Sequence, residues 1–157
     1  MKNIDISIPV SVMDYAELTV EERHLVDEAR AASHRSYAPY SNFHVGAAIA
    51  LDNGVIVTGA NQENVAYPSG TCAERSACFY AHAQYPEAKF KAIAIAALDT
   101  SGKEVAEPIS PCGSCRQALL EYETLAGHNV EVILSGSEKI YKVPSVKSLL
   151  PLAFTEF

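Results

Sequence analysis

Three cysteines and one glutamate are the residues of this sequence whose types and spacing could do chemistry. Cys112 and Cys115 form a C-x-x-C pair, and Cys72 stands alone well upstream. Three thiolates leave one position of a tetrahedral Zn²⁺ open, where a catalytic zinc holds water, whereas a structural site is closed by a fourth protein ligand. Glu74, two residues after Cys72, could move protons to and from that water. The pattern predicts a hydrolytic enzyme.

The local sequence places Cys72 and Cys112 near the starts of two expected helices. Helix N-termini carry partial positive charge and free N–H donors, which lower thiol pKa values and stabilise thiolates. Arg75, one helical turn after Cys72, or Arg116 would offset the negative charge that remains. Residues two apart do not share a face of a regular helix. For Cys72 and Glu74 to face the same metal site, Cys72 must therefore lie at the helix entry, where the backbone is not yet helical.

Two other interpretations of the cysteines remain open at this stage. A C-x-x-C pair can also serve as a redox dithiol. A closed structural zinc site would need a fourth ligand, which Cys78 or one of the five histidines could supply. Cys78 falls inside an expected helix, where a lone cysteine is usually a small core residue.

Length and composition indicate one globular domain spanning residues 1–157. The chain is 48% hydrophobic and 20% charged, and no stretch approaches the roughly 20 apolar residues of a membrane span. With no export signal visible, we expect a cytoplasmic protein whose close cysteine pair binds metal rather than forming a disulfide. The net charge of −7 disfavours a polynucleotide substrate and favours a small neutral or cationic one.

Periodicity and turn signals predict the elements that position these residues. Thr19-Val20-Glu21-Glu22 resembles a capping box and predicts a helix running to about Ser36. Asp52-Asn53-Gly54 predicts a hairpin turn between strands at 43–51 and 55–60. The remaining expected elements are helices at 72–83 and 112–126, strands at 90–98, 130–134 and 140–143, and a small helix at 145–150. This order predicts a three-layer α/β/α fold with a mixed sheet of about five strands.

The motifs around the cysteines resemble those of a known family. Cys72-Ala73-Glu74-Arg75 followed by P-C-G-x-C-R-Q at 111–117 is similar to the zinc-dependent cytidine deaminases of the short, homotetrameric type. The likeness runs from about Tyr37 to Phe154 and includes S-N-F-H-V-G-A-A at 41–48, N-Q-E-N at 61–64, A-Y at 66–67 and L-L-P at 149–151. It implies a cytidine deaminase-like fold and hydrolytic deamination of cytidine and deoxycytidine to uridine and deoxyuridine plus ammonia, in pyrimidine salvage.

The resemblance also implies a role for each matching residue. One Zn²⁺ per subunit would be bound by Cys72, Cys112 and Cys115, with Glu74 as the catalytic proton carrier and Arg75 neutralising the thiolates. The implied nucleoside contacts are Phe43 and Val45 at the base, the Ala73 backbone, the ribose-binding pair Asn61 and Glu63, and Tyr67 and Phe154 reaching into a neighbouring subunit's site. The implied partners are a pyrimidine nucleoside, water and further copies of the chain in a homotetramer, with no nucleic acid and no membrane.

Each nucleoside contact also has a purely structural interpretation. Phe43 and Val45 could form the inward face of a strand. Asn61 and Glu63 could make local hydrogen bonds in a turn, although residues two apart in extended chain point the same way, which suits two contacts to one ligand. Tyr67-Pro68 could be an ordinary loop sequence, and Phe154 could simply dock the C-terminal tail.

Three other functions compete with cytidine deamination. A blasticidin-type nucleoside antibiotic deaminase would carry the same cysteine motifs, but Asn61 and Glu63 favour an ordinary ribose. Polynucleotide-editing enzymes usually have H-x-E where this chain has Cys72-Ala73-Glu74. A non-catalytic zinc and nucleoside binding protein would hold the metal without turnover.

Overall fold

The computed structural model describes residues 1–155. Its helices and strands are, in chain order, β1 (Ser11–Met13), α1 (Val20–Ser33), β2 (His44–Leu51), β3 (Ile56–Ala60), α2 (Ala73–Gln84), β4 (Phe90–Leu98), α3 (Gly113–Ala126), β5 (Glu131–Ser135) and β6 (Ile140–Val143). Short 3-10 turns lie at Tyr15–Glu17, Tyr67–Ser69 and Lys147–Leu149. None of the helices in this part of the chain is both long enough and apolar enough to cross a membrane.

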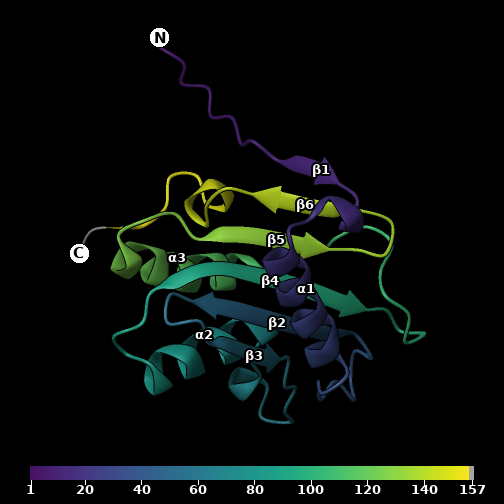
Figure 1. The fold of residues 1–157 in the computed structure, drawn as a ribbon. Helices are drawn as coiled ribbons and strands as arrows, with labels where there is room; N and C mark the ends of the chain where they lie inside the picture. Colours follow the sequence, from purple (N-terminus) through teal and green to yellow (C-terminus); the bar gives the residue numbers. More distant parts are fainter. Residues whose placement is uncertain (156–157) are drawn as a thin grey trace.

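The strands form one mixed sheet in the order β1-β6-β5-β4-β2-β3. β4 and β5 run parallel, and the other neighbouring strands of the described chain pair antiparallel. α1 covers one face of the sheet, and α2 and α3 cover the other (Figure 1). The predicted three-layer α/β/α fold is therefore confirmed, with six strands where about five were expected.

Alternation along the central strands explains why helices cover both faces. On β2, Ala47 and Ile49 join the core beneath α2 and α3, whereas Ala48 joins the core beneath α1. Since successive side chains of a strand point to opposite faces, an apolar run on β2 leaves two faces to be covered. α1 lies close against β2 at Gly46, where a Cβ would be only 2.1 Å from the Ala29 carbonyl oxygen.

The element ends that carry a local signal lie where the sequence predicted them. Thr19 caps α1 in a capping box with Glu22. The Asp52-Asn53-Gly54 turn joins β2 and β3, which pair antiparallel. Gly127 ends α3 in the left-handed conformation with a φ of 72°.

Two predicted element ends were wrong. α1 stops at Ser33 rather than near Ser36, because Tyr37 leaves the helix and donates its backbone N–H to the Asn61 carbonyl. The expected helix at 145–150 is only the 3-10 turn at Lys147–Leu149. The following Pro151 disfavours helical backbone at the residue before it, which keeps this segment short.

β1 is the sixth strand, and the sequence analysis did not predict it. It pairs antiparallel with β6, so that Val12 lies opposite Tyr141. Alternating apolar residues favour extended backbone here, but nothing in the local sequence specifies that Ser11–Met13 pairs with β6. β1 forms because the outer edge of β6 offers unpaired backbone groups that an extended segment can satisfy.

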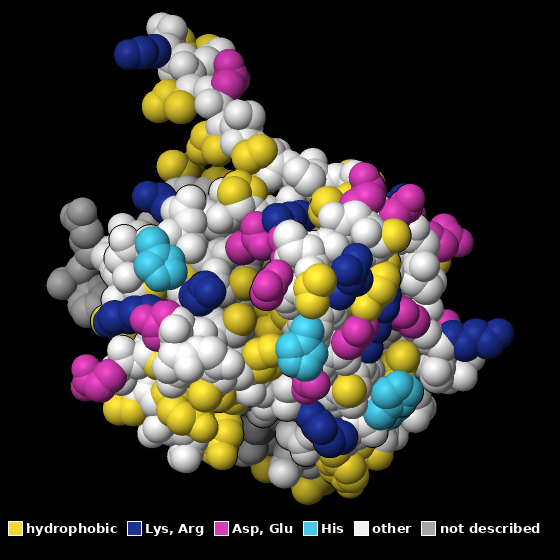
Figure 2. All heavy atoms as spheres, viewed as in Figure 1, with side chains coloured by type: hydrophobic (Ala, Val, Ile, Leu, Met, Phe, Trp, Pro, Cys, Tyr) yellow, Lys and Arg dark blue, Asp and Glu magenta, His cyan; other side chains and the backbone are white. Residues whose placement is uncertain are grey.

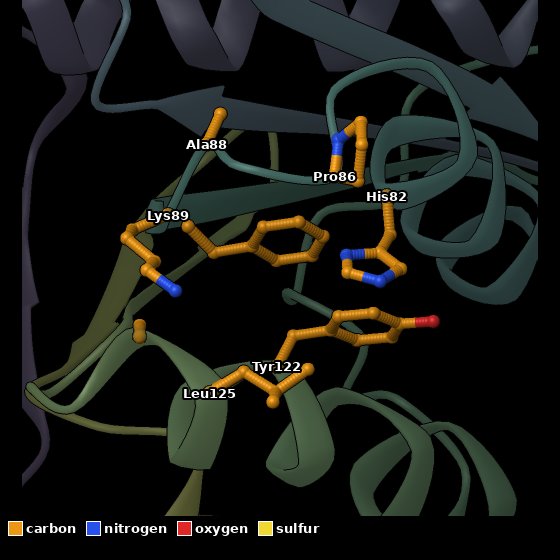
Figure 3. Close-up of a pocket in the computed structure, with 8 residues that line it drawn as sticks. His82, Pro86, Ala88, Lys89, Tyr122 and Leu125 are labelled. Carbon is orange, nitrogen blue, oxygen red and sulfur yellow. The ribbon is translucent and has the colours of Figure 1, made fainter.

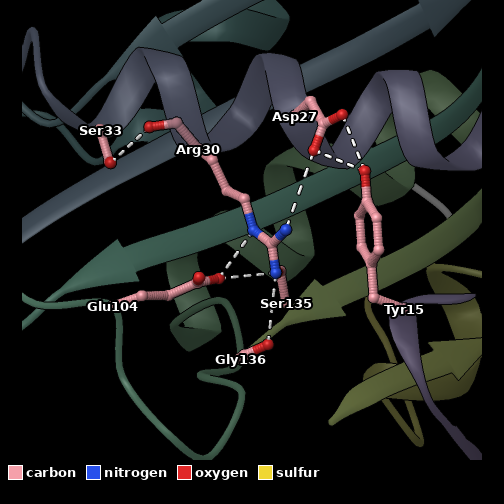
Figure 4. A network of polar contacts seen from close by, with 7 residues as sticks. All are labelled: Tyr15, Asp27, Arg30, Ser33, Glu104, Ser135 and Gly136. Atoms are coloured by element: carbon pink, nitrogen blue, oxygen red, sulfur yellow. Dashed lines mark hydrogen bonds and ion pairs between the residues drawn. The ribbon is translucent and has the colours of Figure 1, made fainter. Parts of the chain in front are cut away.

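Arg30 of α1 organises a polar network on its side of the sheet (Figure 4). Its Nε donates to Glu104 over 2.8 Å, and its guanidinium lies over the Tyr15 ring, 4.8 Å from the centroid. Glu104 also accepts from the Ser135 hydroxyl, and Tyr15 donates to Asp27. These contacts fasten α1 to β5 and to the loop between β4 and α3, so the network stabilises the fold.

Candidate metal centre and active site

The structure brings the three cysteines of the two motifs together. The Sγ atoms of Cys72, Cys112 and Cys115 all lie within 4.8 Å of one another. Cys72 Sγ lies 4.0 Å from Cys112 Sγ, which lies 3.5 Å from Cys115 Sγ. Tetrahedral Zn²⁺ with Zn–S bonds of about 2.3 Å requires sulfur atoms about 3.8 Å apart. The separations and the soft thiolate donors therefore fit zinc.

Two helix entries hold these sulfur atoms in place. Cys72 is the N-cap of α2 and Cys112 the N-cap of α3, while Cys115 lies in the first turn of α3. Cys72 has extended backbone, with φ −72° and ψ 157°, as the sequence analysis required. Neither N-cap side chain makes a capping hydrogen bond to the first turn of its helix, so both sulfur atoms remain available as ligands. The positive ends of two helix dipoles favour thiolates at this point.

The cluster has three protein ligands in the part of the chain that the structure describes. In residues 1–155, no histidine, carboxylate or fourth cysteine groups with the three sulfur atoms. Cys78 is buried inside α2, where burial raises the pKa of its thiol to about 12 and keeps it neutral. The geometry therefore favours an open metal site over the closed structural site that Cys78 or a histidine would have completed.

Arg75 is the cation that contacts the cysteine cluster, through a hydrogen bond to Cys72. Its Nη2 donates to Cys72 Sγ over 3.8 Å, and its buried Nε has no hydrogen-bond partner among the described residues. Bonds from Cys115 and then Arg75 and Cys112 lower the pKa of Cys72 to about 5, against the desolvation that raises it. Arg116, the other candidate, instead donates to the carbonyl oxygens of Pro111 and Leu149, each at 2.8 Å.

Glu74 is buried at the start of α2, with 4% of its surface exposed. Burial raises the pKa of its carboxyl, and the negative charge of Cys72 raises it further. A buried carboxyl whose pKa is raised is a suitable group for accepting and returning a proton. Glu74 also stays outside the ligand cluster of the described chain, which leaves its carboxylate available for proton transfer.

Gly59 of β3 lets α2 lie close against the sheet, and no sequence motif marks this glycine. A Cβ on Gly59 would lie 2.7 Å from the Ala73 carbonyl oxygen and 2.5 Å from the Ala77 nitrogen. Both atoms belong to the α2 backbone, which has no flexible end that could move aside. The first turn of α2, which follows Cys72 and contains Glu74, is therefore seated directly on β3.

Asn61 fastens the segment that carries Phe43 and Val45. Its Oδ1 accepts from the Val45 N–H at 2.7 Å, and its Nδ2 donates to the Phe43 carbonyl at 3.0 Å. Phe43 and Val45 are themselves half-buried, and Val45 packs against the core beneath α2 and α3. The Asn61 amide retains one donor and one acceptor site for a ligand.

Glu63 closes the turn before Phe43. Its Oε2 accepts from the N–H groups of Tyr40 and Ser41, at 2.8 and 3.3 Å. The hydrogen bonds from Ser41 and Tyr40 lower the pKa of this carboxyl, which keeps it ionised. Ser41 in turn accepts from the Phe43 N–H, a contact that the sequence pattern did not reveal.

A hollow of about 310 Å³ lies beside this turn, lined by Tyr40, Glu63, Asn64, Tyr67 and Gly70. Tyr67 is 80% exposed and meets the Tyr40 ring edge-on, with centroids 6.4 Å apart. A volume of this size suits a small molecule. Glu63 and Tyr67 thus line one hollow.

The segment that contains Asn61 and Glu63 is joined to the segment that leads into Cys72 through backbone pairing. Gln62 and Thr71 exchange two N–H to carbonyl hydrogen bonds of 2.9 Å. Thr71 immediately precedes Cys72, and Gln62 lies between Asn61 and Glu63. A shift of either segment would therefore move the other.

Phe154 lies on the C-terminal tail and is 67% exposed. Its carbonyl oxygen accepts from Gln117 Nε2 over 2.9 Å, which ties the tail to α3 two residues beyond Cys115. Both residues that the resemblance assigns to a neighbouring subunit, Tyr67 and Phe154, are thus on the surface of this chain.

A second hollow lies between α2, β4 and α3, at the end of α2 far from Cys72 (Figure 3). Here the Tyr122 ring stacks on Phe90 with centroids 4.7 Å apart and meets His82 at 5.4 Å. Its volume of about 60 Å³ is too small for a nucleoside, because small-molecule sites measure about 300–1,000 Å³. These rings pack the core rather than form a substrate site.

The fold and the site together define a zinc-binding α/β protein with an open metal position beside a buried carboxyl. Comparison with known proteins gives the family. The profile described as the cytidine and deoxycytidylate deaminase zinc-binding region matches residues 19–126. The chain therefore belongs to this zinc-binding deaminase family.

Individual relatives agree with this assignment. The cytidine deaminase of Sporosarcina psychrophila is 39% identical over 132 residues, which is 84% of this chain and 90% of the relative. That of Halalkalibacterium halodurans is 37% identical over 136 residues, covering 87% of this chain and 96% of the relative. The crystal structure of cytidine deaminase from Burkholderia pseudomallei superposes with a TM-score of 0.71 at 38% identity, covering 87% of this chain and all of that one (100%).

Proposed function

We propose that this chain catalyses the zinc-dependent hydrolytic deamination of cytidine and deoxycytidine to uridine and deoxyuridine, with release of ammonia, as one domain spanning residues 1–157. The observation that carries the proposal is a three-cysteine cluster with the buried Glu74 beside it, at the entries of α2 and α3. The named relatives are cytidine deaminases, and this chain matches them over most of their length.

Cys72, Cys112 and Cys115 would hold the Zn²⁺. Bound there, zinc supplies a Lewis acid that makes water a nucleophile near neutral pH. Arg75 donates to the Cys72 thiolate and so reduces the negative charge that three thiolates place on the site. The helix N-termini act in the same direction.

Glu74 carries the protons of the reaction. It accepts a proton as water adds to C4 of the cytosine ring, and it returns protons to N3 and to the departing amine. One water is consumed, one ammonia leaves, and the ring keeps the oxygen as a carbonyl. Burial, which raises the pKa of the Glu74 carboxyl, supports both halves of this cycle.

The nucleoside would lie between the metal centre and the segment that Asn61 fastens. We assign the base to Phe43, Val45 and the Ala73 backbone, and the ribose to the remaining donor and acceptor sites of Asn61 and Glu63. The exposed Tyr67 and Phe154 fit contacts to a neighbouring subunit in a homotetramer. We place the reaction in pyrimidine salvage in the cytoplasm.

The ultraviolet spectrum tests this function directly. Zinc-loaded protein is mixed with cytidine in one cuvette and with blasticidin S in another, and the products are separated by chromatography. We expect the cytidine band to fall as uridine forms, with no change in blasticidin S, because Asn61 and Glu63 are placed for an ordinary ribose. Turnover of blasticidin S alone would contradict the ribose assignment, and zinc-loaded protein inert toward both would favour a binding protein.

A further inference from the structure

The first residues of the chain carry an amphipathic pattern that the deaminase site does not use. The even-numbered positions read Lys2, then five branched apolar residues, then Asp14; the five are Ile4, Ile6, Ile8, Val10 and Val12. Intervening positions before Met13 are polar residues or Pro9. Since alternate residues of an extended strand share a face, this segment has an apolar face with a cation at one end and an anion at the other. We call residues 2–14 the N-terminal arm.

The structure leaves this face uncovered. The five apolar side chains of the arm are between 40% and 83% exposed. Only Ser11–Met13 pairs with the sheet, and the residues before it run outward from β1 (Figure 1). Figure 2 shows the start of the chain projecting from the body, with hydrophobic side chains along it. β1 is also the last strand of the described sheet, so its outer backbone groups form an open edge.

The arm lies before the part of the chain that the family profile matches. The family profile begins at residue 19, beyond Asp14. The Burkholderia structure is matched over its whole length while 87% of this chain is covered. The arm thus lies before the matched profile region, and none of its residues belongs to the proposed metal or nucleoside contacts.

We propose that the N-terminal arm is an interaction surface for a second copy of this chain, with the two arms paired as antiparallel strands about a twofold axis at Ile8. In this register Ile4 faces Val12 of the second copy and Ile6 faces its Val10, so apolar residues meet in every pair on the face. Lys2 of each copy then faces Asp14 of the other. The charges at the two ends of the arm are complementary only in the antiparallel direction.

Neighbouring registers would set charged or polar side chains opposite apolar ones, so the pairing is specific to one register. Sliding the second arm by two residues one way sets Lys2 against Val12, and sliding it the other way sets Ile4 against Asp14. A slip of one residue sets the apolar side chains against the polar positions on the opposite face. Each alternative buries a charge or exposes the apolar residues, so the register centred on Ile8 is selected.

A hollow beside Ile6 indicates where the apolar face would be covered. Ile6 lines a space of about 350 Å³ together with Leu150, Leu152 and Ala153 of the C-terminal segment. In the proposed register Val10 of the second copy lies opposite Ile6 and can enter this space. The paired arms would then rest on the C-terminal segment rather than remain in solvent.

A symmetric cysteine cross-link tests the pairing on the full-length, zinc-loaded protein. Ile8→Cys places two thiols opposite each other, and opposed residues of antiparallel strands lie about 4.5–5.5 Å apart at Cα, within the range for a disulfide. The matched control is Ser7→Cys, which lies opposite Pro9 on the other face. After exposure to oxidised glutathione, we expect a covalent dimer of Ile8→Cys on a non-reducing gel, with Ser7→Cys and the parent chain unlinked.

Equal cross-linking of Ile8→Cys and Ser7→Cys, or none in either, would overturn the proposal. A second variant adds Val10→Lys to Ile8→Cys. Because it sets two lysines against the Ile6 side chains, we expect cross-linking to fall about tenfold or more. Unchanged cross-linking would likewise overturn the register. Cytidine turnover of the arm variants, expected at the parent rate, separates this result from any failure of the proposed function.

Discussion

The metal side and the nucleoside side of the candidate site are built in different ways. On the metal side, Cys72 and Cys112 are N-caps of two helices packed on one sheet face, and Glu74 is buried. On the nucleoside side, Glu63 and Tyr67 come from a loop, and Tyr67 is exposed. The proposed reactive groups thus lie at the starts of two helices, whereas the proposed substrate contacts lie in a segment that side-chain hydrogen bonds hold in place. Substitutions on the metal side should therefore impair zinc binding or chemistry, whereas substitutions on the nucleoside side should impair substrate binding.

Removing a ligand should have the largest effect. Cys112→Ala leaves two thiolates, so we expect loss of stoichiometric zinc, loss of measurable deamination and a lower melting temperature, because bound metal contributes to folding. The measurement is zinc content by atomic absorption together with thermal denaturation.

Cys78→Ala is the matched control for the ligand variant. It removes a cysteine of α2 that lies outside the ligand cluster of the described residues, so zinc content should stay at the parent level. A full complement of zinc in Cys112→Ala would remove Cys112 from the ligand set and leave the metal side without its defining geometry.

Glu74→Gln should separate chemistry from metal binding. The amide keeps the shape of the buried side chain but cannot carry a proton, so we expect kcat to fall by about 10²–10⁴ or more with zinc retained. Steady-state kinetics with cytidine and zinc content measure the two effects. Glu121→Gln, on the exposed surface of α3, is the control and should change neither. Near-normal turnover in Glu74→Gln would contradict the proposed proton-transfer role of Glu74.

Gly59→Ala should disturb the metal side without touching a ligand. The added methyl group meets the backbone of α2 at Ala73 and Ala77, and overpacking of this kind costs about 1–3 kcal/mol of stability. We expect a lower melting temperature and weaker zinc retention against a chelator. At Gly70 the added Cβ meets nothing nearer than 3.5 Å, so Gly70→Ala should keep the melting temperature and zinc retention of the parent. Parent-like zinc retention in Gly59→Ala would show that the close packing of α2 on β3 does not control the metal site.

The same contrast explains what the sequence could predict. The cysteine spacing, the capping box at Thr19 and the strand at Phe90–Leu98 are local patterns, and all three lie where they were predicted. β1, Gly59 and the two bonds of the Asn61 side chain depend on how distant segments meet. No periodicity records such contacts, because each arises from tertiary pairing.

Asn61→Ala should have the smallest effect, on binding rather than on chemistry. It removes the bonds to the Val45 N–H and the Phe43 carbonyl, each worth about 1–3 kcal/mol when a partner is left unsatisfied. The loop that carries Phe43 should loosen, so we expect KM for cytidine to rise about tenfold with kcat within about twofold of the parent. Gln62→Ala, which removes an exposed side chain and keeps the backbone pair with Thr71, is the control and should leave both constants unchanged. If Asn61→Ala lowered kcat and zinc content instead, the pairing of Gln62 with Thr71 would be carrying the disturbance to Cys72, and the two sides would act as one rigid unit.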